Sequence, residues 1–320
     1  MVINLDLKDR KILEQLEIDS RQSNSKIAKK VGLSKDAVAY RIKNLENKKL
    51  VLGYYSVLNI TKLGYQSYKL MITLQDTNSK IEEEIISYLK KERLIGWIVS
   101  CDGYYNLLMV VWVKNYFEFE EFLKKFLKKY SKFIKERDIL ILTENHASRK
   151  RYLFPKKENV SDVYYSNEPK MNLDEKDLKI ITFLANDARK PLYEIGDSLR
   201  LTPEAVSNRI KRLRKDNVIQ AFRPIIDTSL LGYQYYNILF RLKKFSNIEK
   251  IFSYFRQNPN IIYFVKYIGE FDLGIDLEVE NTEKLRQTLQ EIKDLFYTDV
   301  ESYSSVLISK MHKISYYPEL

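Results

Sequence analysis

The chain contains the same sequence twice, and the spacing of the two copies is that of whole domains. The segment "LSKDAVAYRIKNLE" at 33–46 returns as "LTPEAVSNRIKRLR" at 201–214, and the same offset of 168 residues relates Leu5 to Leu173. Solenoid repeats recur about every 20 to 50 residues, so this period is too long for a solenoid. The pattern indicates a tandem duplication of a unit that buries its own core.

Each copy begins with three short stretches of helical periodicity. The third stretch of the first copy follows Ser34, a residue type suited to an N-cap, and it carries Val38, Ile42 and Leu45 on one apolar stripe. The second copy has Thr202 at the cap and Pro203 at the first helical position, where proline is tolerated. Three short helices with a tight turn before the last are typical of a helix-turn-helix.

The turn before the third helix differs between the copies. Gly32 suits a left-handed turn, but Arg200 stands at its place in the second copy and would cost about 1 kcal/mol there if its φ is positive. After the third helix the copies hold Lys49 and Asn217, of which asparagine accepts a left-handed conformation more readily.

The rest of each copy alternates between strand and helix patterns. After a connecting strand at 50–60, the first copy predicts strands and helices in the order strand, helix, strand, strand, helix, strand over 68–144. The second copy, with its connecting strand at 218–228, repeats this order. The order is that of a ferredoxin-like layer of helices on an antiparallel sheet. We therefore expect an α+β fold with two tandem copies of a helix-turn-helix followed by a ferredoxin-like module.

These patterns divide the chain into five segments. We expect a first helix-turn-helix at 1–52, its connecting strand and module at 53–154, a polar linker at 155–172, a second helix-turn-helix at 173–220, and its connecting strand and module at 221–320.

Composition restricts the kind of protein. The net charge of +11 favours a polyanionic partner if the basic residues are localised. The single cysteine and two histidines exclude a disulfide framework and offer no set of metal ligands, and no motif calls for a cofactor. Acidic and basic residues near the start interrupt any signal peptide, and no apolar run is long enough to span a membrane. We expect a cytoplasmic protein without metal or cofactor.

The motifs resemble those of a known family. "LDLKDRKILEQL…DSR", "IAKKVGLS" and "DGYYN" in the first copy, and "LDEKDLKIITFL…DAR" and "GEFD" in the second, are similar to leucine-responsive/asparagine-type (Lrp/AsnC) transcriptional regulators. The resemblance implies a winged helix-turn-helix that binds double-stranded DNA. It also implies that the ferredoxin-like module pairs subunits and, in many members, senses amino acids. Fusion would make the chain an internal pseudo-dimer, with further self-association possible through the modules.

The recognition helices supply the expected DNA contacts. The N-terminal half of such a helix lies nearest the base edges, while basic and hydroxyl side chains suit guanine or phosphate and Asn suits adenine. The outward-facing residues and shared basic positions are Ser34, Lys35, Asp36, Ala39, Tyr40, Arg41 and Lys43 in the first copy, and Thr202, Glu204, Ser207, Asn208, Arg209, Lys211 and Arg212 in the second. Arg41 and Arg209 could instead brace their domains. Because the outward residues differ, we expect an asymmetric operator.

The resemblance also places an effector site at the turns before the central strands. The residues concerned are Gly103, Tyr104, Asn106, Gly269, Phe271 and Asp272. Asp272 retains a carboxylate that could meet an amino-acid ammonium, whereas Asn106 does not, so the second copy is the better candidate.

Two other functions remain as alternatives. Sirohaem decarboxylases share this architecture, but their pattern of His, Tyr and Arg before the central strand is not matched, because "WIVSCDGYYN" and "FVKYIGEFD" contain neither His nor Arg. We therefore expect that the chain is not an enzyme. The other alternative is an effector-sensing or assembly protein with vestigial DNA-binding domains.

Overall fold

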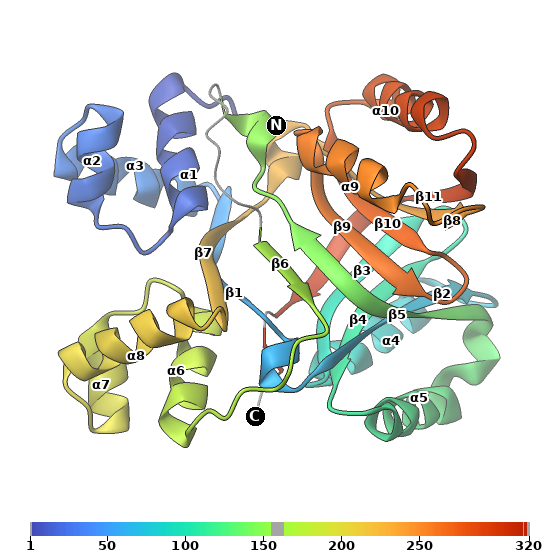
Figure 1. The fold of residues 1–320 in the computed structure, drawn as a ribbon, viewed down its shortest axis with the longest axis horizontal. Helices are drawn as coiled ribbons and strands as arrows, with labels where there is room; N and C mark the ends of the chain where they lie inside the picture. The colour runs from blue at the N-terminus through green and yellow to red at the C-terminus, as the bar shows by residue number, and fades with distance from the viewer. Residues whose placement is uncertain (1, 155–162, 316, 319–320) are drawn as a thin grey trace. The chain divides into compact units, whose positions relative to one another are not determined.

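The computed structural model describes residues 2–154, 163–315 and 317–318 (Figure 1). The chain forms two compact units that cut across the two sequence copies. The first, here the helical unit, comprises residues 1–59, 148–163 and 171–233; the second, here the barrel unit, comprises residues 60–147, 164–170 and 234–320.

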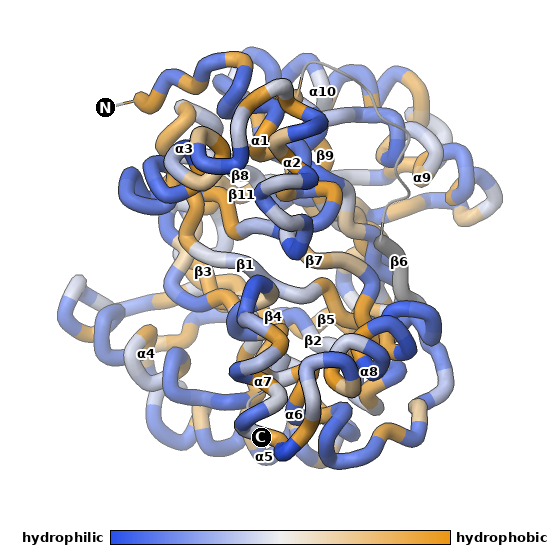
Figure 2. The backbone as a smooth tube through the Cα atoms, turned by 90° about the vertical axis from the view of Figure 1, so that its left-hand side faces the viewer, coloured by the Kyte–Doolittle hydropathy of each residue, from blue (hydrophilic) through white to orange (hydrophobic). Residues whose placement is uncertain are grey.

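The helical unit contains the two expected helix trios. They are α1 (Leu7–Ile18), α2 (Asn24–Val31) and α3 (Lys35–Asn47), and α6 (Glu175–Asn186), α7 (Leu192–Leu199) and α8 (Pro203–Lys215). Asp6 and Asp174 cap the first helix of each trio, and each carboxylate accepts a hydrogen bond from a backbone N–H in the first turn. The expected stripe of Val38, Ile42 and Leu45 is buried. Hydrophobic segments alternate with hydrophilic ones along these helices, as expected of elements that bury one face (Figure 2).

The two connecting strands join the trios into one unit. Strands β1 (Val51–Leu58) and β7 (Ile219–Ile226) pair antiparallel, α1 packs against β7, and α6 packs against β1. The backbone N–H of Ser20 donates to the carbonyl of Phe222 at 2.9 Å, and Ala188 makes the equivalent bond to Tyr54 at 2.9 Å. Each trio thus packs on the strand of the other copy, which ties the two trios together.

The barrel unit is built from two ferredoxin-like modules. Its main elements are β2 (Gln66–Leu74), α4 (Ser79–Lys91), β3 (Ile95–Asp102), β4 (Leu107–Val113), α5 (Tyr116–Tyr130) and β5 (Ile134–Ala147), followed by β8 (Gln234–Leu242), α9 (Ile248–Gln257), β9 (Ile261–Ile268), β10 (Leu273–Val279), α10 (Thr282–Leu295) and β11 (Val300–Ile314). The strand order is β2-β4-β3-β11-β8-β10-β9-β5, and β5 pairs with β2 as well. The eight strands therefore close into one antiparallel barrel.

Three apolar clusters fill the barrel unit. One lies between the strands of the first module and its helices α4 and α5, with Phe122 and Phe126 buried. A second lies between the strands of the second module and its helices α9 and α10, with Phe252 and Phe255 buried. The third lies inside the barrel and draws on both modules, including Met71 and Leu239. The expected α+β fold in two copies is confirmed, and the closed barrel joins the two ferredoxin-like modules.

The expected linker at 155–172 is only partly described. Residues 155–162 lie outside the described residues, whereas Val163–Ser166 form strand β6, which extends the sheet beyond β5. Short 3-10 turns lie at Thr61–Leu63, Ser131–Phe133, Arg151–Leu153 and Thr228–Leu231. Among the described helices, none is both long and apolar enough to cross a membrane.

Candidate nucleic-acid interface

The recognition helices α3 and α8 begin in the same way despite different sequences. The hydroxyl of Ser34 accepts a hydrogen bond from the N–H of Ala37 at 3.1 Å, and the hydroxyl of Thr202 accepts one from Ala205 at 3.1 Å. The turn before each helix is left-handed, with φ 66° at Gly32 and 54° at Arg200. The second copy thus carries an arginine in a conformation that favours glycine, which meets the condition stated for the cost of this substitution.

Most of the expected DNA contacts lie on the surface. The exposed members of the set are Ser34, Lys35, Asp36, Tyr40 and Lys43 on the first trio, and Thr202, Glu204, Asn208, Lys211 and Arg212 on the second. Ala39 and Ser207 are half-buried at equivalent positions. Tyr40 is 74% exposed. Their roles as DNA contacts stay predictions.

Arg41 and Arg209 are held by ion pairs within their own trios. Arg41 donates to Asp6 and to Asp9 at 2.7 Å each, and Arg209 donates to Asp174 and Asp177 at 2.7 Å each. These contacts fasten the recognition helix to the first helix of the trio. The N-cap bond from the backbone N–H of Asp9, followed by the hydrogen bond from Arg41, lowers the pKa of Asp6. For Asp174 the hydrogen bond from Arg209 is the larger cause, followed by the backbone N–H of Asp177. The bracing role considered for both arginines thus has a direct structural basis.

A set of basic residues on the second helix of the first trio was missed by the sequence reasoning. Lys26, Lys29 and Lys30 of α2 are exposed, whereas the equivalent positions of α7 hold Glu194, Asp197 and Ser198. In a helix-turn-helix this helix crosses the DNA backbone, so its charge decides how it meets phosphate. Comparing the aligned segments "NSKIAKK" and "LYEIGDS" by charge, in addition to hydrophobic periodicity, would have found the difference.

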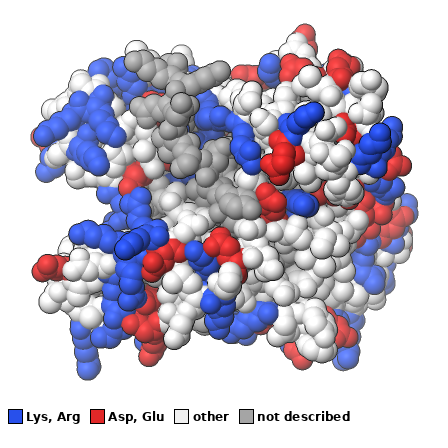
Figure 3. Space-filling model, in the orientation of Figure 1, with Lys and Arg blue, Asp and Glu red and all other residues white. Residues whose placement is uncertain are grey.

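The C-terminal half of the recognition helix has the opposite asymmetry. In α8 the residues Arg212, Arg214 and Lys215 are exposed, while α3 has Asn44, Glu46 and Asn47 at these positions. Glu46 accepts a hydrogen bond from the hydroxyl of Tyr54 at 2.7 Å, and Arg214 lies 3.2 Å from a carboxylate oxygen of Asp19. Basic side chains therefore gather on α2 in one trio and at the end of α8 in the other (Figure 3).

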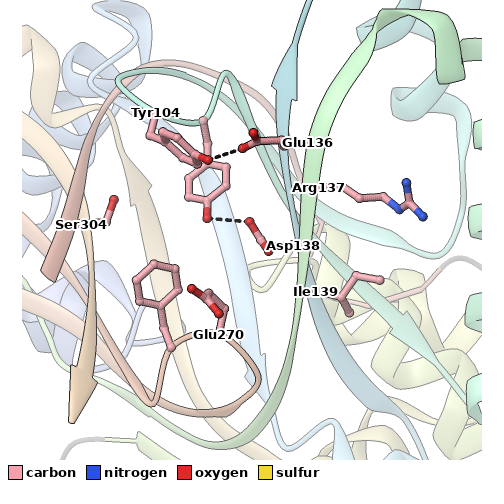
Figure 4. A pocket seen from close by; sticks show the side chains of 9 residues that line it. Tyr104, Glu136, Arg137, Asp138, Ile139, Glu270 and Ser304 are labelled. Atoms are coloured by element: carbon pink, nitrogen blue, oxygen red, sulfur yellow. Dashed lines mark hydrogen bonds between the residues drawn. The ribbon is translucent and has the colours of Figure 1, made fainter. Parts of the chain in front are cut away.

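The turns expected to hold an effector line one pocket of the barrel unit. The pocket has a volume of about 920 Å³, and Tyr104, Tyr105 and Phe271 lie in its wall (Figure 4). Glu136, Asp138 and Glu270 bring three carboxylates and Arg137 brings one guanidinium, and Glu270 is ion-paired with Arg241. The hydroxyl of Tyr105 donates to Asp138 at 2.8 Å, and that of Tyr104 donates to Glu136. Burial, followed by the bond to Asp138, raises the pKa of Tyr105.

The polar residue at the end of each turn is a backbone brace. Asn106 accepts a hydrogen bond from the N–H of Leu74 at 2.7 Å, and Asp272 accepts one from the N–H of Leu242 at 2.7 Å. Both glycines, Gly103 and Gly269, have a φ of 144°, a conformation that other residues rarely adopt. Neither Asn106 nor Asp272 lies in the pocket wall, where Tyr104 and Phe271 do.

The comparisons with known proteins address both copies. The AsnC-type helix-turn-helix domain matches residues 5–46 and 173–214. The HTH-type transcriptional regulator FL11 of Pyrococcus horikoshii is 31% identical over 141 residues, which are 44% of this chain and 92% of that protein. The chain belongs to the Lrp/AsnC family. Another Lrp/AsnC regulator, LrpA of Pyrococcus horikoshii, is 32% identical over 113 residues, or 35% of this chain and 77% of LrpA. The two helix trios are thus helix-turn-helix domains of the AsnC type.

A solved enzyme shares the fold of this Lrp/AsnC chain along nearly its whole length. The siroheme decarboxylase NirDL covers 97% of this chain and is itself covered to 94%, with a TM-score of 0.65 and 14% identity. Our expectation that the chain is not an enzyme is wrong as an exclusion, because the tandem Lrp/AsnC architecture is also that of a decarboxylase. At this identity the likeness establishes the fold, and the activity belongs to NirDL.

Proposed function

We propose that the protein is a sequence-specific transcriptional regulator that binds double-stranded DNA through two unequal helix-turn-helix domains of one chain. The observation that carries the proposal is the pair of exposed recognition helices, both held in one compact unit by the β1–β7 pairing. A chain of this kind acts as an internal pseudo-dimer. Its two readers would meet major grooves about 34 Å apart, or a multiple of that spacing.

The differences between the trios favour an asymmetric operator. Lys35, Asp36 and Tyr40 face outward on α3, where α8 has Pro203, Glu204 and Asn208. The expected contacts with the DNA backbone differ as well, because one trio has exposed lysines on α2 and the other has exposed basic residues at the C-terminal end of α8. Two half-sites of unlike sequence would satisfy two unlike readers, whereas a palindrome suits identical ones.

Selection of bound sequences from random DNA tests this function. The selected site should be asymmetric, and its affinity should fall steeply with salt because lysines and arginines release counterions from phosphate. Lys43→Glu with Lys211→Glu should abolish retention of the site without changing thermal stability, because both side chains are exposed. Unchanged retention by this variant would show that the domains are vestigial.

We further propose that an amine-bearing effector, such as an amino acid, occupies the pocket of Figure 4. The carboxylates of Glu136 and Asp138, which accept hydrogen bonds from Tyr104 and Tyr105, favour a cationic group, whereas Glu270 is already paired with Arg241. The phenol rings of Tyr104 and Tyr105 can contact an ammonium or the carbon chain next to it. Basic and neutral amino acids, compared by thermal shift with and without Asp138→Asn, test the site; a shift that survives the substitution places the ligand elsewhere.

A second candidate function is an enzymatic reaction on a tetrapyrrole, favoured by the whole-chain fold shared with NirDL. That protein has also been solved in complex with an iron-uroporphyrin III analogue. The pocket of Figure 4 does not suit such a ligand, because the carboxylates of Glu136 and Asp138 would repel those of a uroporphyrin. His312 offers a ring nitrogen 2.7 Å from the hydroxyl of Ser100, and burial lowers its pKa.

Incubation of the purified protein with siroheme decides between the candidates. Release of carbon dioxide, together with a change in the tetrapyrrole spectrum, would support the enzyme. A spectrum that stays constant while the same preparation binds its selected DNA supports the regulator.

A further inference from the structure

The inner faces of the two ferredoxin-like modules meet inside the barrel. We call residues 60–147 module 1 and residues 234–320 module 2. Lys69 on β2 and Asn237 on β8 occupy the same place in their modules, because the offset of 168 residues relates them. Their cross-strand partners, Val110 on β4 and Asp276 on β10, are therefore equivalent as well.

Three of these residues, Lys69, Asn237 and Asp276, form a hydrogen-bonded chain between the modules. The ammonium of Lys69 donates to Oδ1 of Asn237 at 2.8 Å, and Nδ2 of Asn237 donates to Oδ1 of Asp276 at 2.5 Å. The hydroxyl of Tyr235 also donates to Asp276, at 3.0 Å. Lys69 is only 3% exposed. One amide thus links a buried ammonium of module 1 to a carboxylate of module 2.

Burial inside the barrel shifts the pKa values of both Lys69 and Asp276. Burial lowers the pKa of Lys69 to about 8, while the charge of Asp276 acts in the opposite direction. Burial raises the pKa of Asp276, and the charge of Lys69 opposes this. Each charge therefore depends on the other module for its compensation.

Pairing of like modules would remove this compensation. If module 1 met a second module 1, Lys69 would face another Lys69, and Val110 would stand where the carboxylate is needed. If module 2 met a second module 2, each copy of Asp276 would be buried without the ammonium of Lys69. Uncompensated buried charges strongly disfavour both arrangements.

We propose that Lys69, Asn237 and Asp276 make the module interface selective for unlike modules, so that module 1 accepts module 2 and rejects a second copy of itself. Charge asymmetry inside the barrel then determines which halves pair, and the duplication made that asymmetry possible. The inference concerns assembly of the barrel and does not depend on the proposed function.

Exchange of the inner-face residues between modules tests the proposal in the full-length chain. Lys69→Asn with Val110→Asp gives module 1 the pattern of module 2, and Asn237→Lys with Asp276→Val does the reverse. The fourfold exchange restores one ammonium and one carboxylate in swapped places. As a matched control, Met71→Leu with Leu239→Met exchanges two equivalent apolar residues of the same interior.

A disulfide reports whether the barrel forms. Ile308 is the cross-strand partner of the native Cys101, and both side chains belong to the cluster inside the barrel. Ile308→Cys therefore places a second thiol opposite Cys101 only when β11 of module 2 pairs with β3 of module 1. Each variant is made in this background, refolded in a glutathione redox buffer, and examined for disulfide yield and thermal midpoint.

Each twofold charge exchange should lower the disulfide yield severalfold and the midpoint by about 5 to 10 °C. The fourfold exchange should recover most of both, and the apolar control should resemble the parent. Twofold exchanges that resemble the parent would overturn the proposal. A fourfold exchange as poor as the twofold ones would also overturn it, even if the latter fail to fold.

Discussion

Arg209 places Nη1 2.7 Å from Oδ1 of Asp177, and Arg41 makes the same contact with Asp9 in the other copy. Both pairs join the recognition helix to the first helix of its trio. The two aspartates differ in burial and in their partners. Asp177 is buried and forms a second ion pair, with Arg212, whereas Asp9 is less buried and pairs with Arg41. Equivalent substitutions at the two arginines should therefore have unequal effects.

Arg209→Gln should lower the free energy of unfolding by about 1 to 2 kcal/mol, because it removes one partner of a buried carboxylate. Arg41→Gln should cost less than about 1 kcal/mol, because its pair is more exposed and screened by solvent. Urea denaturation of both variants measures the difference. Equal losses would mean that the burial of Asp177 does not matter.

Arg200→Gly should stabilise the second trio by about 1 kcal/mol, because the residue has a φ of 54°. The matched change is Lys49→Asn, at a φ of 60°, which should stabilise by a smaller amount because asparagine tolerates this conformation only partly. Thermal denaturation checks both. Destabilisation by Arg200→Gly would show that the arginine side chain makes a contact worth more than the strain.

The two trios should differ in how they hold the DNA backbone. Replacing Lys26, Lys29 and Lys30 with the equivalent residues of α7 (Glu, Asp and Ser) should weaken binding and reduce the slope of log affinity against log salt by up to about 3. The reverse exchange of Glu194, Asp197 and Ser198 for lysines should strengthen binding and steepen the slope. Titrations at several salt concentrations measure it, and an unchanged slope in both variants would place α2 and α7 away from phosphate.

Lys69 predicts a change of stability with pH. Its pKa is about 8 when folded, against 10.5 for an ordinary lysine, so the unfolded chain holds more protons between these values. Stability therefore rises with pH through this window, by up to about 3 kcal/mol, and is constant on either side. The difference between the wild type and Lys69→Met isolates this contribution from that of the tyrosines. A difference that stays flat from pH 8 to 10.5 would mean that Lys69 is hydrated.

The sequence predicted the fold well where local signals agree. The caps Ser34 and Thr202, the stripe of Val38, Ile42 and Leu45, and the order of strands and helices are all readable from residue type and period. Closure of the barrel could not be predicted from the sequence, because the pairing of β5 with both β2 and β9 depends on contacts between segments far apart in the chain. Residue pattern alone cannot fix such pairings.

The candidate sites were predicted in part. Outward-facing residues of α3 and α8 follow from helical periodicity, and the turn glycines led to the pocket. Asp272 was assigned to the ligand, yet it accepts a backbone bond from Leu242, a use that its residue type does not reveal. Glu136 and Asp138 were missed because they lie on β5, far in sequence from the turns that they meet.

The central claim is that two unequal readers of one chain bind one asymmetric site. It is tested most directly by binding of the purified protein to three DNA duplexes: the site selected from random sequences and the two palindromes made by repeating either half. We predict that the protein binds the asymmetric site at least about tenfold more tightly than either palindrome. The reason is that each mismatched base pair in a half-site costs about 1 to 3 kcal/mol of binding free energy. Equal affinity for all three duplexes, or for random DNA, would contradict the account.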